Sequence, residues 1–143
     1  MLVICGFWGQ GPIARIVGEI LGAAPEARVH AVCGENDAAR RALEAAAAGH
    51  TRLAIHGALP TIAPLLAECG SVVTKPGIST LLEAHAARRQ LFLLRGMPVA
   101  EDHNWDHAIR RFGARPYDPA ALAAFVSGAD PNQTQAAAEA AQW

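Results

Sequence analysis

Short apolar segments rich in β-branched residues alternate with longer segments of helical periodicity, and this alternation constrains the fold more than any other feature. The segments that we expect to form strands are Leu2–Cys5, Val29–Cys33, Leu53–Ile55, Ser71–Thr74 and Leu91–Leu94. The expected helices lie near residues 12–23, 37–48, 61–68, 79–89 and 104–112. Continuous apolar strands joined by helices predict a parallel sheet with helices on both faces. The predicted fold class is therefore α/β, a doubly wound Rossmann-like sheet.

The length of 143 residues fits one domain of ordinary size. We expect this domain to span residues 1–129, with residues 130–143 forming a C-terminal helix or tail that packs on a partner domain or frays. No apolar segment reaches the roughly 20 residues of a membrane-spanning helix. The N-terminus has neither a basic stretch nor a cleavage site, so we expect a cytoplasmic protein.

Charge and cysteine content argue against several classes of function. The formal net charge is -1, and the arginines are scattered rather than gathered into one basic segment, so we expect no nucleic-acid partner. Cys5, Cys33 and Cys69 lack CxxC spacing, which favours neither a zinc site nor a disulfide framework. We expect these cysteines to be small buried residues.

Ligands of doubly wound sheets bind at the carboxyl ends of the strands, so the loops there are the informative segments. The glycines of Gly6–Pro12 could hold a phosphate or a sugar, or could form only a tight turn, and their GxxGxG spacing differs from that of dinucleotide enzymes. Cys33–Asn36 could face a nucleotide, or Asn36 could cap the next helix. His56–Pro60 could hold a base through backbone groups, or form an ordinary turn.

The fourth loop, Thr74–Thr80, has the richest chemistry. A strand ends there, Pro-Gly breaks the chain, and we expect a helix to begin at Ser79 or Thr80. Amide groups at a helix start, together with the helix dipole, favour anion binding. Thr80 and Glu83 also fit a capping box, which leaves helix capping and ligand contact as equal alternatives.

The fifth loop, residues 95–107, gathers acid, histidine and asparagine side chains that could bind the hydroxyl groups of a sugar. The alternative is a solvated loop in which Asp102 or Asn104 caps the following helix. His103 and His107 have the i, i+4 spacing of metal ligands, but no third ligand is placed in sequence, so we expect no metal.

Taken together, these loops resemble the donor-binding, C-terminal half of inverting GT-B glycosyltransferases. The segments that carry the resemblance are Ile4–Pro12, Val32–Asn36, Val73–Ala84 and Pro98–Asn104. Their order and spacing, across about residues 1–127, resemble monogalactosyldiacylglycerol synthases and the related peptidoglycan N-acetylglucosaminyltransferases. The TKPGxxTxxEA pattern beginning at Thr74 is the most specific part.

The resemblance implies four groups of contacts with a uridine-diphosphate sugar. Those with the donor diphosphate would come from Gly9, Gly11, Gly77, Ile78, Ser79 and Thr80. Glu83 would bind the ribose hydroxyls, and the base would lie against Cys33, Gly34, Ala58 and Leu59. The sugar would face Glu101, Asp102, His103 and Asn104. Ala100 stands where the family has glutamine, which leaves the identity of the hexose open.

The implied function is transfer of a hexose from this donor to a lipid-linked or other acceptor, in glycolipid or cell-envelope biosynthesis, without a metal or other cofactor. The general base would belong to an N-terminal acceptor domain or a separate subunit, so we expect the chain to be inactive alone. A membrane surface would be reached through that partner. Alternatives are half of a sugar-nucleotide epimerase or hydrolase, or a noncatalytic nucleotide-binding module. A nicotinamide dehydrogenase is disfavoured by the glycine spacing, although Glu35 follows the second strand as a ribose-binding acid would.

Overall fold

The computed structural model describes residues 1–5, 9, 11–95 and 102–130. Within these residues the chain forms a six-stranded sheet in which every pair of neighbours is parallel. The strands are β1 (Leu2–Ile4), β2 (Val29–Val32), β3 (Leu53–His56), β4 (Ser71–Thr74), β5 (Gln90–Leu93) and β6 (Arg115–Pro116). The helices are α1 (Ile13–Ala23), α2 (Asp37–Ala46), α3 (Ala63–Glu68), α4 (Ile78–Ala86), α5 (Asp102–Arg111) and α6 (Pro119–Val126). The predicted α/β Rossmann-like fold is confirmed.

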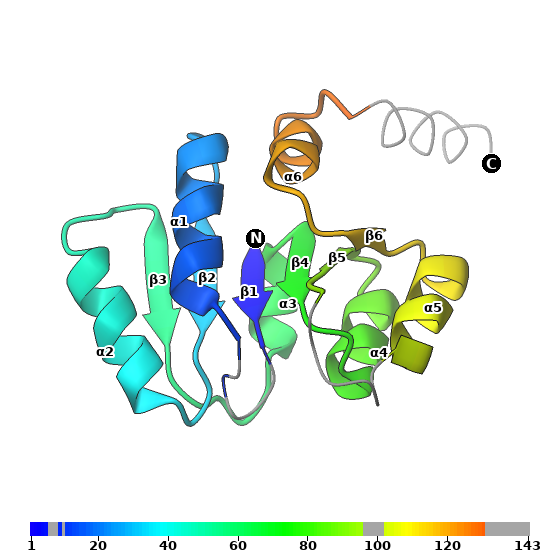
Figure 1. Ribbon diagram of the computed structural model, residues 1–143, viewed down its shortest axis with the longest axis horizontal. Helices are drawn as coiled ribbons and strands as arrows, with labels where there is room; N and C mark the ends of the chain where they lie inside the picture. Colours follow the sequence, from blue (N-terminus) through cyan, green and yellow to red (C-terminus); the bar gives the residue numbers. More distant parts are fainter. Residues whose placement is uncertain (6–8, 10, 96–101, 131–143) are drawn as a thin grey trace.

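The strand order is β3-β2-β1-β4-β5-β6, so the chain starts in the middle of the sheet and winds toward both edges (Figure 1). β1 pairs with β2 on one side and with β4 on the other. The connections that leave β1 and β4 therefore diverge, and such a reversal of strand order opens a crevice at the carboxyl ends of the strands.

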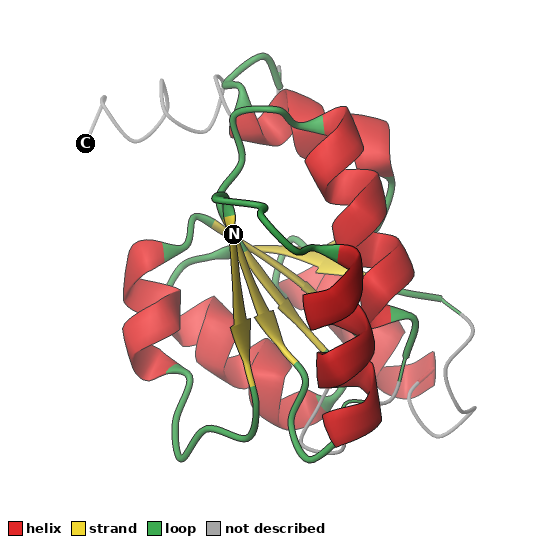
Figure 2. Cartoon of the chain, turned by 90° about the vertical axis from the view of Figure 1, so that its left-hand side faces the viewer, coloured by secondary structure: helices red, strands yellow, loops and turns green. Residues whose placement is uncertain are grey.

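Helices cover both faces of the sheet (Figure 2), and an apolar layer lies under them on each face. On one face α1, α2 and α6 pack against side chains such as Val3, Ala31 and Val73. On the other face α3, α4 and α5 pack against Leu2 and its counterparts on the neighbouring strands. Successive strand residues point to opposite faces, and this alternation decides which side chains reach each layer.

Several helix ends are held by side chains. Asn36 caps α2, because its Oδ1 accepts a hydrogen bond from the backbone N–H of Ala39 at 2.9 Å, which confirms the capping alternative. At the C-terminal end of α1, the guanidinium of Arg52 donates to the carbonyl oxygens of Leu21, Ala24 and Ala27 at 3.0–3.1 Å. A residue just before β3 thus donates to carbonyl groups at and beyond this helix end, of which that of Ala24 also accepts from Ala27 N.

The C-terminal part of the described chain contains two elements that the sequence pattern did not predict. β6 has two residues and includes a proline, so no periodic pattern can mark it. α6 is almost entirely apolar and lacks an amphipathic period, but Asp118 caps it at Ala121 N and Pro119 occupies its first turn. An Asp-Pro pair of this kind is the signal that could have revealed the helix. Elsewhere the strand ends predicted from sequence differ by about one residue.

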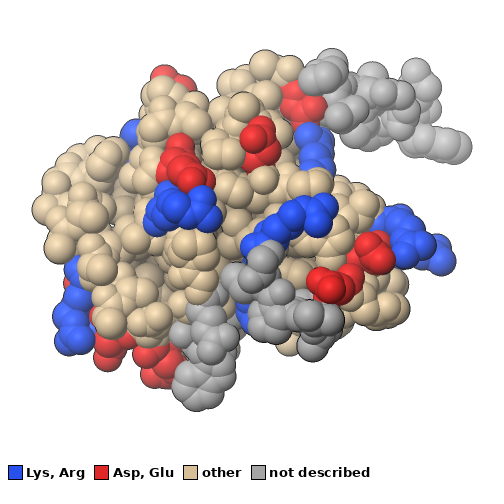
Figure 3. All heavy atoms as spheres, in the orientation of Figure 1, with Lys and Arg blue, Asp and Glu red and all other residues tan. Residues whose placement is uncertain are grey.

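The surface and the termini of the described chain add several observations. Cys5, Cys33 and Cys69 are unpaired by disulfides and buried, as predicted. On the face seen in Figure 3, positive and negative side chains are interspersed rather than separated into patches of one sign.

Within the described ranges, no helix is both long enough and apolar enough to cross a bilayer. Asp130 is buried and pairs with Arg115, which joins the last described residue to β6.

Candidate functional site

A cavity of about 370 Å³ lies at the carboxyl end of the sheet, on the side covered by α3 and α4. Its walls come from the last residues of β1 and β2, the loops after β2 and β3, and the first two turns of α4. The lining residues are Ile4, Val32, Gly34, Ala58, Leu59, Pro60, Thr61, Ile62, Ser79, Thr80 and Glu83. Segments far apart in sequence therefore meet in one concave site, as expected at a reversal of strand order.

The start of α4 forms one end of this cavity. The helix begins at Ile78, and Gly77 occupies the N-cap position with extended backbone (φ -78°, ψ 128°). No side chain of the described residues caps it. The backbone N–H groups of the first turn are therefore available to an anion, and the helix dipole favours negative charge there. Ser79 and Thr80 line the cavity, whereas the side chain of Ile78 is exposed outside it.

This start corrects two expectations. We predicted a helix beginning at Ser79 or Thr80 and, as one alternative, a capping box formed by Thr80 and Glu83. Because Gly77 is the N-cap, Thr80 is the third residue of the helix and Glu83 the sixth, so they cannot form that motif. The capping alternative is wrong for this pair, and both residues line the cavity.

Asn104 fixes the turn that leads into α4. Its side-chain Nδ2 donates a hydrogen bond to the carbonyl oxygen of Pro76 at 3.0 Å, across 28 residues of sequence. Asn104 is the third residue of α5 rather than its cap, so the alternative in which Asn104 caps this helix is wrong. The residue that the resemblance assigned to the sugar thus also holds α5 against the turn at Gly77.

The glycine loop packs against the loop after β2. Gly9 is buried with φ +60°, and a Cβ at this position would lie 2.0 Å from the carbonyl oxygen of Cys33. The Nδ2 of Asn36 donates to the carbonyl oxygen of Gly9 at 3.3 Å. Close packing therefore accounts for glycine here. Gly11 is exposed, with φ 139°, and neither glycine lines the cavity. Residues 6–8 and 10 of this loop lie outside the described residues.

Cys33 does not face the cavity, which corrects its assignment to the base. Its side chain is fully buried in the layer under α1 and α2, because Val32 points to the cavity and the next residue points to the opposite face. Its backbone N–H donates to the carbonyl oxygen of His56, and its own carbonyl oxygen accepts from Asn36 N. Gly34, the other residue predicted at this loop, does line the cavity.

Burial also removes the thiols from the chemistry of this site. Desolvation raises the pKa of Cys5 to about 11, although the positive charge of Lys75 acts in the opposite direction. Desolvation likewise raises the pKa of Cys33. Thiols with raised pKa stay protonated at neutral pH, and the thiolate is the nucleophilic form. The site is therefore built for binding through backbone groups, hydroxyls and one carboxylate, not for cysteine nucleophilic catalysis.

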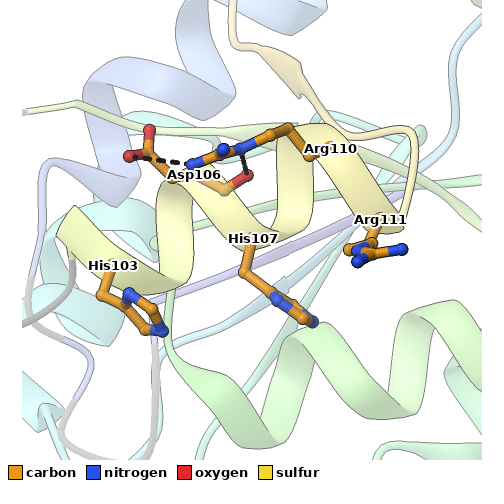
Figure 4. Close-up of a pocket in the computed structure, with 5 residues that line it drawn as sticks. All are labelled: His103, Asp106, His107, Arg110 and Arg111. Atoms are coloured by element: carbon orange, nitrogen blue, oxygen red, sulfur yellow. Dashed lines mark hydrogen bonds and ion pairs between the residues drawn. The ribbon is translucent and has the colours of Figure 1, made fainter.

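None of the described residues that were predicted to contact the sugar lines the cavity at the start of α4. His103 lines a different cavity of about 540 Å³ on α5, together with Asp106, His107, Arg110 and Arg111 (Figure 4). There His103 and His107 extend from one edge of the helix toward α4, while Arg110 and Asp106 form an ion pair at 3.6 Å. Asp102 is exposed in the first turn of α5, and Glu101 lies outside the described residues. Among described side chains, no cluster of three His, Cys, Asp or Glu residues could hold a metal ion.

Sequence reasoning missed part of the cavity wall. Thr61 and Ile62 line it beyond the loop of His56–Pro60 that was predicted to hold a base. Thr61 turns the chain into α3, since its Oγ1 accepts a hydrogen bond from Ala63 N at 3.2 Å. The Pro-Thr pair before an apolar segment was a usable signal for a loop closing on a helix start.

Comparison with known proteins places this fold. No family model matches the sequence, and no curated protein matches it. Among solved structures, the chain is similar to the crystal structure of Arabidopsis thaliana UGT89C1 complexed with UDP, with a TM-score of 0.60 and 20% sequence identity. The match covers 93% of this chain and 35% of that chain, so this chain spans about a third of its neighbour's length. That neighbour is a GT-B glycosyltransferase, and the likeness establishes a shared fold.

Proposed function

We propose that the chain is the donor-binding half of a GT-B glycosyltransferase and that it binds a uridine-diphosphate sugar in the cavity between α4 and the loop after β3. The observation that carries this proposal is the meeting of three complementary groups in one cavity. They are the uncapped start of α4, the carboxylate of Glu83 and the backbone of residues 58–62. The fold shared with a protein crystallised with UDP supports the choice of nucleotide.

Each part of the donor has a chemical counterpart in this cavity. A diphosphate would accept hydrogen bonds from N–H groups at Ser79 and Thr80, where the helix dipole stabilises negative charge. Ribose hydroxyls are donors, and Glu83 offers an acceptor-only carboxylate about one helical turn farther along α4. A uracil ring would lie against Ala58 and Leu59, whose backbone groups can bind its amide-like edge.

The chemistry that follows is mainly electrostatic. When a hexose leaves the donor, negative charge develops on the diphosphate, and fixed N–H dipoles at Ile78–Thr80 would stabilise it. We assign the general base and the acceptor site to a second, N-terminal domain or a separate subunit. The finer parts of the proposal are an inverting reaction, a lipid-linked acceptor reached at the cytoplasmic face of a membrane through that partner, and membership of the monogalactosyldiacylglycerol synthase group.

Calorimetry with UDP, 2′-deoxy-UDP and NAD tests the nucleotide site. We expect UDP to bind and Glu83→Gln to weaken it by about tenfold or more, since hydrogen bonds to a charged group contribute about 1.5–3 kcal/mol. In the wild-type protein, 2′-deoxy-UDP should bind more weakly than UDP by about the same factor. In Glu83→Gln, removing the 2′-hydroxyl should reduce the affinity little further. Glu44→Gln, on the exposed surface of α2, is the matched control and should bind UDP unchanged. Binding of NAD without binding of UDP would refute the proposal.

A further inference from the structure

Two histidines and a glutamate form a chain of contacts beside the cavity. His30 of β2 and His56, the last residue of β3, lie with Nδ1 of His30 3.0 Å from Nε2 of His56. The other ring nitrogen of His30, Nε2, lies 3.4 Å from Oε2 of Glu68 in α3. The two rings are stacked, with centroids 5.2 Å apart. Neither histidine lines the cavity, and the sequence pattern did not indicate that they form a pair.

This arrangement fits neutral imidazoles. If His30 carries its proton on Nε2, toward Glu68, its Nδ1 is an acceptor for the N–H of His56. A single added proton can still be shared along the contact, because one ring donates and the other accepts. When both rings are protonated, both facing nitrogens are donors and both rings are cations, so the 3.0 Å contact cannot persist.

His56 connects this contact to the nucleotide cavity. Its carbonyl oxygen accepts the hydrogen bond from Cys33 N, which joins the ends of β2 and β3. The chain continues directly into Gly57 and then into residues 58–62, which line the cavity. The position of His56 therefore sets where the loop that we assign to the base begins.

We propose that the His30–His56 contact positions the loop of residues 57–62 for nucleotide binding and that double protonation releases the loop, so that affinity for the nucleoside falls in acid. The inference rests on the proposed function, because it concerns the base end of that site. His30 and His56 are positioning residues that act through the loop.

The charges that face the pair set the direction of this effect. Glu68 of α3 is exposed and lies against His30, the member of the pair farther from the loop. Arg40 of α2 brings a permanent positive charge to the same loop, since a Cβ on Gly57 would lie 3.7 Å from its Nη1. Desolvation, and then the neighbouring His30, lower the pKa of His56. Both factors oppose a second positive charge at the His30–His56 contact, so the loop is released only below neutral pH.

The test measures uridine affinity from about pH 7.5 to about pH 5.5, the range in which histidines titrate. Uridine is the probe because it has no phosphate to titrate over this range. We expect the wild-type affinity to fall by about tenfold over this range, because protonation of the free protein competes with binding. His56→Gln and His30→Gln should flatten this profile, whereas His50→Gln, an exposed histidine in the turn before β3, should keep it.

Nuclear magnetic resonance separates failure of this inference from failure of the proposed function. Without any ligand, the amide signals of Ala58 and Leu59 should shift together with the ring signals of His30 and His56. If uridine never binds but the amides follow the histidines, only the proposed function fails. A flat uridine profile, or loop amides that ignore both histidines, overturns the inference.

Discussion

Alanine at Gly9 and alanine at Gly18 should change stability in opposite directions. The first change places a Cβ 2.0 Å from the carbonyl oxygen of Cys33 and 2.9 Å from Cβ of Asn36, at a residue with φ +60°. Left-handed backbone costs a non-glycine residue about 1–2 kcal/mol. Contact at 2.0 Å is not tolerated by real atoms, so the loop must move by about 1 Å or more, and lost packing and hydrogen bonding add about 1–3 kcal/mol. We expect Gly9→Ala to lower the free energy of unfolding by about 2–5 kcal/mol.

Gly18 provides the matched control because the chemical change is identical. It lies inside α1, is exposed, and has no atom within 4 Å of the position that a Cβ would occupy. Alanine there should raise the free energy of unfolding by about 0.5–1 kcal/mol through helix propensity. Urea denaturation followed by circular dichroism measures both values. Equal stabilities of Gly9→Ala and the wild-type protein would refute the packing argument for the glycine loop.

Three further predictions concern stability. Asn36→Ala should lower the free energy of unfolding, measured by urea denaturation, by about 1–2 kcal/mol, because it removes the cap of α2 and the hydrogen bond to Gly9. Asn36→Asp should restore the cap but not the hydrogen bond to Gly9. Arg52→Met should lower the free energy of unfolding by about 1–3 kcal/mol, since three carbonyl groups lose the guanidinium donor, although that of Ala24 keeps its hydrogen bond from Ala27 N. A melting temperature unchanged by this substitution would contradict the role of Arg52. Burial lowers the pKa of His56 in the folded protein, so the unfolded chain takes up a proton at this residue first as the pH falls. The free energy of unfolding should therefore decrease below about pH 6.5. Thermal unfolding of His56→Gln should show a smaller decrease over the same range.

The sheet and much of the cavity were predictable from the sequence because both depend on local patterns. Apolar strands alternating with helices require a parallel sheet, and the Pro-Gly turn before Ser79 indicates a helix start at a strand end. The predictions that failed depend on the direction in which a side chain points and on the register in which strands pair. Cys33 was assigned to the base from its place in a loop, but alternation along β2 turns its side chain to the other face.

Two other outcomes show the limit of local reasoning. The role of Asn104 depends on a hydrogen bond to Pro76, 28 residues away, which no spacing within the fifth loop encodes. The contact between His30 and His56 requires knowing that β2 and β3 are neighbours and in which register they pair. In both cases the missing information is the pairing of distant segments, whereas residue chemistry was already visible in the sequence.

The hydrogen bond from Asn104 to Pro76 has a thermodynamic consequence for the proposed donor site. It makes the start of α5 and the turn before α4 a single unit, so a ligand that orders one of them also orders the other. The hexose and the diphosphate of one donor would then bind with coupled free energies: ordering by the diphosphate would reduce the entropy lost on binding the sugar. Preference for an intact nucleotide sugar over its separate parts would thus arise from the framework around the cavity as well as from contacts with the hexose itself.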